Sequence, residues 1–361
     1  MTTYIVSRDI LAENVRKLQK RAGSVPIWAV IKGDGYGLGA LPLAETLREN
    51  GIDRFCVTEV REAELLRQNG FENEPILMLR ETVQREELGR LLDAHVILTV
   101  GSTATAKCVN DIAATRADMA EVHLKIDTGM GRFGFLPEQI DEIIDLYRTM
   151  RCLTFGGIYT HFNCAFSDEA VTRREFAEFR GVIDRLHAAG LETGIVHCCN
   201  SAAFLRFPEM HCDAVRLGSA LLGRMPFKTE LQPVGYVQTQ VEMLRTLPTG
   251  HTTGYGALWR AKRDTPVAIL PVGWYHGFNV SCKPDMSRAA DCLRSGLSAV
   301  KQLLHRRRVT AEINGKRCPV IGAIGMLHVA VDVSAVPCKL GDPAVMQINP
   351  LHVKGIPVRF R

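Results

Sequence analysis

Long hydrophobic runs are missing from this sequence. No uninterrupted apolar stretch approaches the ~18 to 20 residues that a membrane helix needs. The N-terminal stretch, MTTYIVSRDILAENVRKLQKRAG, also lacks the apolar core and the small-residue cleavage site of a secretory leader. It predicts instead a short strand followed by an amphipathic helix from about Asp9. We therefore expect neither a leader nor membrane association.

Paired cysteines and a strong net charge are missing as well. The eleven cysteines show no CxxC spacing and one adjacent pair, Cys198 and Cys199, so neither a metal site nor a disulfide framework is indicated. A reducing cytoplasm is the predicted location. The net charge of +5 is modest and mixed along the chain, and the run HRRR at residues 305–308 is interpreted as the solvated face of a helix. Nucleic-acid binding is not expected.

What the sequence does contain is a repeated alternation of short β-branched runs and helix-like segments. With 361 residues, 46% of them hydrophobic, the chain can bury the core of one large domain or of two ordinary ones. Eight short runs precede about residue 220, and they begin at Val25, Arg54, Pro75, His95, Glu121, Phe155, Gly194 and Asp213. Eight βα units in that length match the count and size of a (β/α)₈ barrel of the TIM type. A doubly wound parallel sheet is the structural alternative.

The pattern changes after about Met225. Alternating short runs such as VGYVQTQVEML and TPVAILPVGW, bounded by Gly, Pro and Asp, predict a second, mainly β domain. The predicted domains are therefore residues 1–224, the barrel, and residues 225–361, the β domain. A helix-like segment at about 286–308 is interpreted as an insertion in the second domain.

Polar residues gather at the carboxyl ends of the predicted barrel strands, where enzymes of this architecture place their active sites. The candidates at strand ends are Lys32, Thr160, His161, Asn200, Ser201 and Arg216, and the glycine turn KIDTGMGRFG adds Lys125 and Arg132. Three of them have simpler interpretations: His161 as a core histidine, Lys125 as a lysine that reaches solvent, and Ser201 as a helix N-cap. Their position on one rim of one barrel favours a common site.

The loops after the seventh and eighth strands predict a phosphate site. The segments NSAAF and RLGSALLG supply a hydroxyl, glycines and helix starts at those two places. A phosphate held beside a lysine on the first strand suggests pyridoxal 5'-phosphate, whose aldehyde forms a Schiff base with a lysine amine. Lys32 fits this role, because desolvation and nearby cations make a lysine easier to deprotonate.

Seven motifs then resemble one known family. AVIKGDGYGLGA, HLKIDTGMGRFGF, GIYTHFNCA, HCCNSAAFLRFPE, AVRLGSALLG, TTGYGALW and PVGWYHGF stand in the order and spacing seen in alanine racemases, the fold type III pyridoxal phosphate enzymes. The similarity runs from near the N-terminus to about residue 350. It implies a racemase that interconverts L- and D-amino acids and serves peptidoglycan precursor supply. Alanine is the expected substrate, with serine or a bulkier amino acid as alternatives.

The resemblance implies a role for each matching residue. Lys32 would carry the cofactor and act as one of two acid/base groups, and Tyr255, in TTGYG, would be the other. In the family this tyrosine enters from the partner subunit, so a homodimer with shared active sites is implied. Arg216 would hydrogen-bond the pyridine nitrogen, with His161 behind it. The other implied residues are Tyr36, Asn200, Ser201, Gly218 and Ser219 for the cofactor, Arg132 and Met326 for the substrate carboxylate, and Lys125 as a carbamylated lysine that positions Arg132.

The match departs from the family mainly in the second domain. The departures are Leu38 for a histidine, Trp274 for a tyrosine, His276 for an aspartate, and Ala323, Gly325 and Leu327 for Arg, Cys and Asp. The C-terminal tyrosine of the family is also missing from NPLHVKGIPVRFR. Cofactor binding is therefore better supported than alanine as the substrate. Two alternatives stay open: a non-catalytic pyridoxal phosphate-binding or regulatory protein, and a decarboxylase of the same fold type, although no Gly-Gly-Gly phosphate loop is found.

Overall fold

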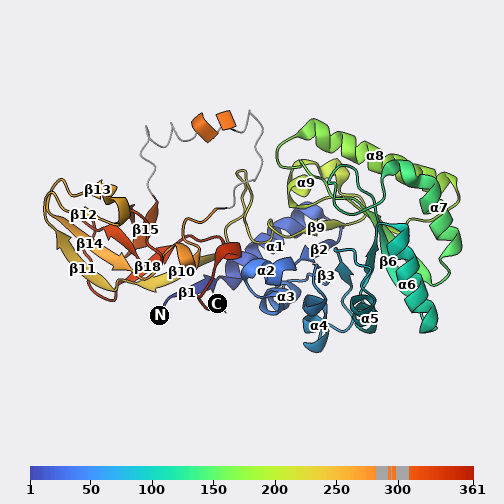
Figure 1. Ribbon diagram of the computed structural model, residues 1–361, viewed down its shortest axis with the longest axis horizontal. Helices are drawn as coiled ribbons and strands as arrows, with labels where there is room; N and C mark the ends of the chain where they lie inside the picture. The colour runs from blue at the N-terminus through green and yellow to red at the C-terminus, as the bar shows by residue number, and fades with distance from the viewer. Residues whose placement is uncertain (282–291, 294, 298–308) are drawn as a thin grey trace. The chain divides into compact units, whose positions relative to one another are not determined.

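The computed structural model describes residues 1–281, 292–293, 295–297 and 309–361, and its chain forms two compact units (Figure 1). The barrel unit comprises Arg8–Val234. The β unit comprises Met1–Ser7 together with Gly235–Arg361. No helix in the described part of the chain combines the length and the apolar composition that a membrane crossing requires.

A closed ring of parallel strands forms the core of the barrel unit. The strands are β2 (Ile27–Val30), β3 (Arg54–Val57), β4 (Ile76–Met78), β5 (Leu98–Val100), β6 (Ala120–Lys125), β7 (Leu153–Tyr159), β8 (Ile195–His197) and β9 (Val215–Leu217). They form two four-stranded sheets, β4-β3-β2-β9 and β5-β6-β7-β8. The bridges Leu77↔Ile97 and His197↔Ala214 join the sheets at both edges and close the ring. The predicted (β/α)₈ barrel is confirmed, and the doubly wound alternative is wrong.

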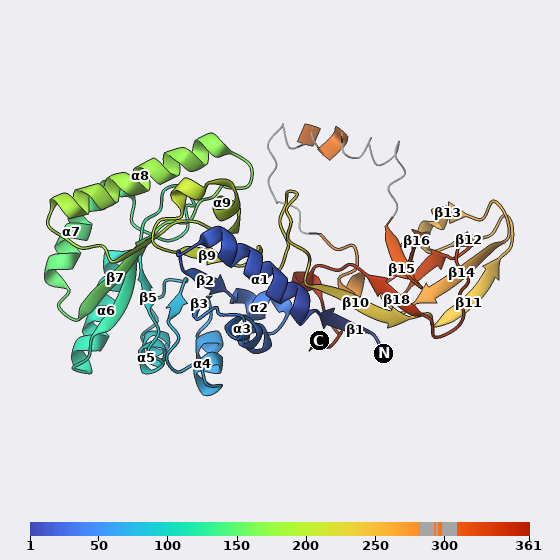
Figure 2. The same cartoon turned by 180° about the vertical axis from the view of Figure 1, so that it is seen from behind.

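Helices lie on the outside of these strands (Figures 1 and 2). They are α1 (Arg8–Ala22), α3 (Ala40–Glu49), α4 (Val60–Gln68), α5 (Arg85–Asp93), α6 (Thr103–Thr115), α7 (Ile140–Thr149), α8 (Glu169–Ala188) and α9 (Ser201–Arg206). Each long helix buries an apolar stripe at helical spacing, as α8 does with Phe179, Val182 and Leu186. The Asp168 carboxylate starts α8 by accepting a hydrogen bond from Val171 N at 3.0 Å.

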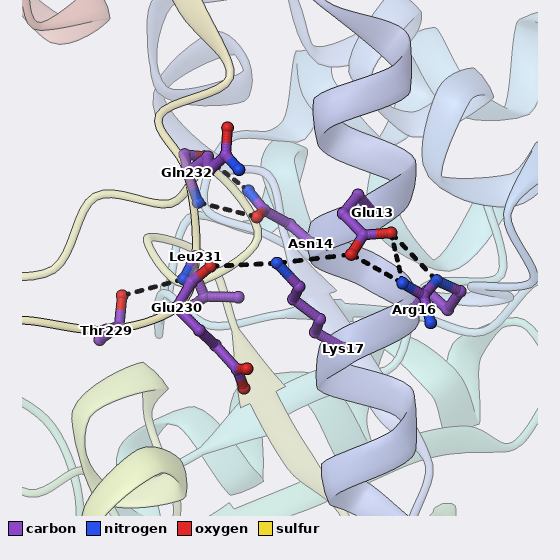
Figure 3. A network of polar contacts seen from close by, with 8 residues as sticks. All are labelled: Glu13, Asn14, Arg16, Lys17, Thr229, Glu230, Leu231 and Gln232. Atoms are coloured by element: carbon purple, nitrogen blue, oxygen red, sulfur yellow. Dashed lines mark hydrogen bonds and ion pairs between the residues drawn. The ribbon is translucent and has the colours of Figure 1, made fainter.

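Helix α1 also anchors the segment through which the chain leaves the barrel unit (Figure 3). The buried Asn14 amide donates to Gln232 O at 2.8 Å and to Leu221 O at 3.1 Å, and its oxygen accepts from Gln232 N at 3.0 Å. Lys17 adds a hydrogen bond to Glu230 O at 3.1 Å. The side chains of α1 thus hold the exit segment through its backbone groups. The side chains of the exit segment take no part in these hydrogen bonds.

The β unit is built around a nine-stranded sheet in the order β11-β14-β17-β16-β15-β18-β10-β1-β19. Its strands are β1 (Thr3–Val6), β10 (Gly235–Gln240), β11 (Met243–Leu247), β14 (Thr265–Leu270), β15 (Thr310–Ile313), β16 (Lys316–Ile321), β17 (Val329–Asp332), β18 (Pro343–Met346) and β19 (Val358–Phe360). A two-stranded ribbon, β12 (Thr252–Thr253) and β13 (Trp259–Arg260), carries the turn with the candidate Tyr255. The predicted mainly β second domain is confirmed.

The division of the chain differs from the predicted boundary between residues 224 and 225. The exit segment up to Val234 belongs to the barrel unit, and the first seven residues belong to the β unit. The reason is strand pairing: β1 pairs antiparallel with β10, Tyr4 opposite Val237, and parallel with β19. The predicted insertion at 286–308 falls largely outside the described residues.

Candidate active site

One cavity of about 330 Å³ in the barrel unit collects the residues predicted to bind a cofactor. Its lining includes all eight of them, namely Lys32, Tyr36, His161, Asn200, Ser201, Arg216, Gly218 and Ser219. They come from the carboxyl ends of β2, β7, β8 and β9, which lie side by side in the ring. Among the described residues, no cluster of three or more His, Cys, Asp or Glu side chains is arranged to hold a metal ion.

Lys32 begins a left-handed turn, α2 (Lys32–Gly37), directly after β2. Gly33, Asp34, Gly35 and Tyr36 all have φ between 52° and 64°. Glycine adopts this conformation without strain, whereas it costs roughly 1–2 kcal/mol for each L-residue with a side chain. The turn therefore stores strain at Asp34 and Tyr36, as is common beside functional groups.

Tyr36 reaches from this turn to the end of β9. A methyl group added at Gly218 would lie 2.1 Å from the Tyr36 hydroxyl oxygen and 2.8 Å from its Cζ atom. A side chain at position 218 would therefore force the Tyr36 ring to shift, and glycine leaves room for it. This contact joins the first and the last strand of the barrel at the cavity wall.

Ser201 and Asn200 organise the two loops that were predicted to hold a phosphate. The Ser201 hydroxyl oxygen accepts hydrogen bonds from Gly218 N at 3.1 Å and Ala220 N at 3.2 Å. The N-cap of α9 is Asn200, whose side-chain oxygen accepts from Ala202 N and Ala203 N. The interpretation of Ser201 as a simple N-cap is therefore wrong, since its hydroxyl holds the loop after β9 instead.

Arg216 is fixed in the barrel by one histidine and by backbone oxygens. Its guanidinium donates to His197 Nδ1 at 2.6 Å, to His197 O at 2.9 Å and to Thr160 O at 2.6 Å. The histidine behind Arg216 is thus His197, and the prediction of His161 in that place is corrected, because the last residue of β8 rather than the loop after β7 faces the guanidinium. His161 contributes to the cavity wall.

A second buried histidine continues this chain of hydrogen bonds. His197 Nε2 lies 2.8 Å from His123 Nδ1, and both rings are fully buried. Burial and the neighbouring Arg216 lower the pKa of His123 to about 3 and hold that of His197 well below its usual value. Because Arg216 can only donate, neutral His197 must accept at Nδ1 and donate from Nε2 to His123. The guanidinium is therefore the charged member of the chain.

Lys125 and Arg132 lie on the strand and in the loop next to this network. Lys125 ends β6 and is 3% exposed, and its ammonium lies 5.4 Å from the ring centres of Phe133 and Tyr159. Burial, then Arg132 and Arg216, lower its pKa to about 8. The simpler interpretation of Lys125 as a lysine that reaches solvent is therefore wrong, because the side chain is buried.

The glycine turn that carries Arg132 is held by the Asp127 carboxylate. One carboxylate oxygen accepts from Gly129 N, Met130 N and Gly131 N at 2.8 to 3.1 Å, and the other accepts from Arg132 N at 3.0 Å. Burial alone would raise the pKa of Asp127, but these four backbone donors lower it below the usual value. Asp127 therefore fixes the backbone from which the exposed Arg132 side chain extends.

Cations dominate the electrostatics around the cavity. Burial lowers the pKa of Lys32, and the positive charge of Arg132 lowers it further, against smaller opposing effects of Cys56 and Glu62. Burial, followed by the charges of Arg216, Lys125, Lys32 and Arg132, keeps the pKa of His161 well below its usual value. The arrangement favours an anionic ligand and a neutral lysine amine.

The remaining predicted residues belong to the β unit. Tyr255 starts a short helical turn, η3 (Tyr255–Ala257), and is 82% exposed, and Met326 is 48% exposed between β16 and β17. The substituted segments contact one another: Trp274 N donates to Gly325 O at 3.1 Å and the next amide donates to Met326 O. The departures at Trp274 and Gly325 therefore lie together in the β unit, whereas Leu38 belongs to the barrel unit.

Sequence reasoning missed His123, His197, Asp127 and Glu62. A signal existed for two of them. His123 lies two residues before Lys125 on the same strand and therefore faces the same way, and His197 is the last residue of its strand. For Asp127 and Glu62 the contacts are made to backbone amides, which residue type alone does not indicate.

Comparisons with known proteins agree over both units. Family models described as "Alanine racemase, N-terminal domain" and "Alanine racemase, C-terminal domain" match residues 6–226 and 234–353. The alanine racemase of Desulforamulus reducens is 34% identical over 338 residues, covering 91% of this chain and 84% of that protein. The alanine racemase of Methanococcus maripaludis is 32% identical over 340 residues, and the match covers 92% of this chain and 84% of that protein.

Solved structures show the same relationship. The alanine racemase of Clostridium difficile 630 has a TM-score of 0.81 and 27% identity, and the match covers 98% of this chain and 93% of that one. The alanine racemase from a D-cycloserine-producing Streptomyces lavendulae has a TM-score of 0.84 and 23% identity, and the match covers 100% of this chain and 97% of that one. This similarity supports the fold. The chain therefore belongs to the alanine racemase family and is an amino-acid racemase.

Proposed function

We propose that the protein is a pyridoxal 5'-phosphate-dependent alanine racemase. The observation that carries the proposal is the cavity that joins Lys32, whose pKa is lowered, to the fixed guanidinium of Arg216 and to the loops held by Ser201. Because the family match covers both domains of an enzyme, the non-catalytic and decarboxylase interpretations are set aside. When bound, pyridoxal phosphate would link to amines and withdraw electrons from the substrate Cα.

The residues of the cavity fit this cofactor at both of its ends. Tyr36, Ser201, Gly218 and Ser219 would hold the phosphate, since they supply hydroxyl and backbone donors around one glycine-lined wall. Lys32 would bind the cofactor covalently, and burial favours the neutral amine that this reaction needs. The convergence of cations around the cavity suits the negative charge of a phosphate.

Arg216 would face the ring nitrogen. Its guanidinium has no acceptor atom and is held by His197 and by backbone oxygens, so it can only donate a hydrogen bond there. Arg216 would therefore leave the ring nitrogen unprotonated and moderate the electron withdrawal that the cofactor supplies. His161 and Asn200 would complete the walls around the cofactor.

Two groups on opposite faces of the substrate would move the Cα proton. Lys32 would act on one face, and Tyr255 of a second copy of the chain would act on the other. The exposure of Tyr255, 82%, supports its use by another chain, and this requires a homodimer with shared sites. Arg132 and the Met326 backbone would hold the substrate carboxylate.

Lys125 would be carbamylated, with its neutral amine adding to CO₂ and releasing one proton. The lowered pKa of about 8 supports this step, because only the neutral amine is a nucleophile. The resulting anion would attract Arg132, whose charge already acts on Lys125. The site would thereby gain a fixed orientation for the arginine that meets the substrate.

A deuterium-exchange screen tests the proposed function. Purified protein is incubated with pyridoxal phosphate and single amino acids in D₂O, and exchange at Cα and product chirality are measured. Alanine is the expected substrate, and serine and bulkier amino acids are screened because residues of the β unit depart from the family pattern. Lys32→Ala should abolish the absorbance of the lysine-bound cofactor, and Tyr255→Phe should keep it but block racemisation.

A matched control is Tyr236→Phe, which removes a tyrosine hydroxyl from β10 and should leave racemisation unchanged. Full activity of Tyr255→Phe in both directions would contradict the two-base assignment. Absence of exchange with every amino acid tested, despite cofactor binding, would contradict racemisation itself.

A further inference from the structure

The left-handed turn after β2 needs an external support. Asp34 and Tyr36 carry side chains at φ values of 52° and 56°, a conformation that L-residues avoid. Within the turn, Asp34 O accepts a hydrogen bond from Gly39 N at 2.9 Å, and Gly35 N donates to Ile31 O at 2.8 Å. These bonds close the turn but do not tie it to the rest of the barrel.

Besides the packing of Tyr36 against Gly218, a hydrogen-bonded tie to the barrel comes from the buried carboxylate of Glu62 on α4. One of its oxygens accepts a hydrogen bond from Asp34 N at 2.8 Å. The other accepts from Thr58 N at 3.0 Å and Glu59 N at 3.1 Å, at the start of its own helix. Glu62 is 3% exposed, so these three backbone amides take the place of water around the carboxylate.

Asp34 is thereby clamped between two helices. Its backbone amide is held by Glu62 of α4, and its own carboxylate accepts from Ala40 N at 2.9 Å at the start of α3. Lys32 lies two residues before this clamp and Tyr36 two residues after it. Any movement of the clamp therefore changes the direction of both side chains that line the cavity.

We propose that Glu62 is a positioning residue of the racemase, which orients Lys32 and Tyr36 for the cofactor by holding the left-handed turn through Asp34 N. The proposal rests on the proposed use of pyridoxal phosphate. Glu62 acts at one remove, since its carboxylate meets backbone amides of the turn and of α4. A merely structural role would be the support of α4 alone, through Thr58 N and Glu59 N.

The variant Glu62→Gln separates the two roles. Glutamine keeps one oxygen, which can still accept from Thr58 N and Glu59 N at the helix start. Its NH₂ group then faces Asp34 N, where two donors meet and the hydrogen bond is lost. The helix support is retained, whereas the clamp on the turn is released.

The test measures binding of pyridoxal phosphate to cofactor-free full-length protein by absorbance titration, with thermal unfolding recorded in parallel. Glu62→Gln is expected to weaken binding at least tenfold. The control Asp168→Ala, which removes the capping carboxylate of α8, should change the dissociation constant less than twofold. Binding by Glu62→Gln within twofold of the original protein would overturn the proposal.

A double-mutant cycle with Tyr36→Phe shows whether Glu62 acts through the turn. If it does, the loss in binding caused by Glu62→Gln is smaller in the Tyr36→Phe background than alone. Strict additivity of the two losses would count against positioning of Tyr36 by Glu62. Failure of the original protein to bind pyridoxal phosphate would refute the proposed function. The titration of the original protein shows this separately from any effect of Glu62→Gln.

A measurement on the original protein covers the case in which Glu62→Gln does not fold. Hydrogen exchange of the Asp34 amide is followed by NMR. Because this amide is bonded to Glu62, it should exchange at least a hundredfold more slowly than in an unstructured peptide. Exchange of the Asp34 amide at the rate of an unstructured peptide would contradict its hydrogen bond to Glu62 and overturn the proposal.

Discussion

Replacement of Lys125 by methionine tests the electrostatics of the site without any cofactor. Burial and two neighbouring guanidinium groups, those of Arg132 and Arg216, lower the pKa of Lys125 from 10.5 to about 8. The difference corresponds to about 3 kcal/mol of unfavourable free energy for holding the ammonium in the folded protein at pH 7. Lys125→Met removes the charge and keeps the length of the side chain.

The sign of the pH dependence follows from linkage. Between pH 8 and 10.5 the unfolded chain binds the Lys125 proton more tightly than the folded chain, so the free energy of unfolding rises with pH across this window. Below pH 8 both states are protonated and the full penalty is present. Lys125→Met should therefore raise the free energy of unfolding by about 1–3 kcal/mol at pH 7, and this gain should vanish by pH 10.5.

The assay is urea unfolding of cofactor-free protein in CO₂-free buffer at pH 7 and pH 10.5. Trp28, which is 1% exposed in the barrel core, reports on the barrel unit in a background with Trp259→Phe and Trp274→Phe. Lys107→Met removes an exposed lysine from α6 and serves as the control with no pH-dependent gain. Equal effects of Lys125→Met at both pH values would refute the reasoning.

Three further predictions concern backbone and buried polar groups. Gly218→Ala should lower the free energy of unfolding, measured in urea, by about 1–3 kcal/mol, because the added methyl overlaps Tyr36. When Tyr36→Ala is introduced in the same chain, most of that loss should disappear. Gly33→Ala meets no atom within 4 Å at a φ of +64°, so its loss should be about 1–2 kcal/mol of backbone strain, and Gly23→Ala at +63° should lose the same amount. His197→Leu removes the side-chain acceptor of the buried Arg216 guanidinium, which keeps its backbone acceptors, and also leaves His123 Nδ1 without its partner. The free energy of unfolding should fall by about 1–3 kcal/mol, whereas an unchanged value would contradict the hydrogen-bond assignment.

The barrel and its cofactor wall could be predicted because their signals are local. Each strand is a short apolar run, and its carboxyl end is fixed by the parallel topology, so polar residues at those ends had to meet. The side-chain partner of Arg216 could not be predicted in the same way. His161 follows the end of β7 and His197 is the last residue of β8, so both lie at the same rim, and only the three-dimensional positions of the rings distinguish between them.

The pairing of strands that are distant in the sequence could also not be predicted from local residue patterns. Residues 3–6 predict a strand correctly, but nothing in their sequence says that they pair with β10 and β19 instead of the barrel. The left-handed turn is a similar case. The glycines at 33 and 35 indicate a turn, whereas the same conformation at Asp34 and Tyr36 is accompanied by tertiary contacts with Glu62 and Gly218 that no local pattern indicates.

The closure of the barrel is itself what assembles the site. Strand β2 pairs in parallel with β9, with Trp28 opposite Arg216 in register. Lys32 follows the end of β2 and Gly218 follows the end of β9, so this one pairing brings the lysine, the guanidinium and the Tyr36–Gly218 contact to neighbouring positions. An open doubly wound sheet of the same strands would separate its first strand from its last. The cavity and the closed fold are therefore not independent conclusions, because a chain that failed to pair β2 with β9 could not place Lys32 beside Arg216.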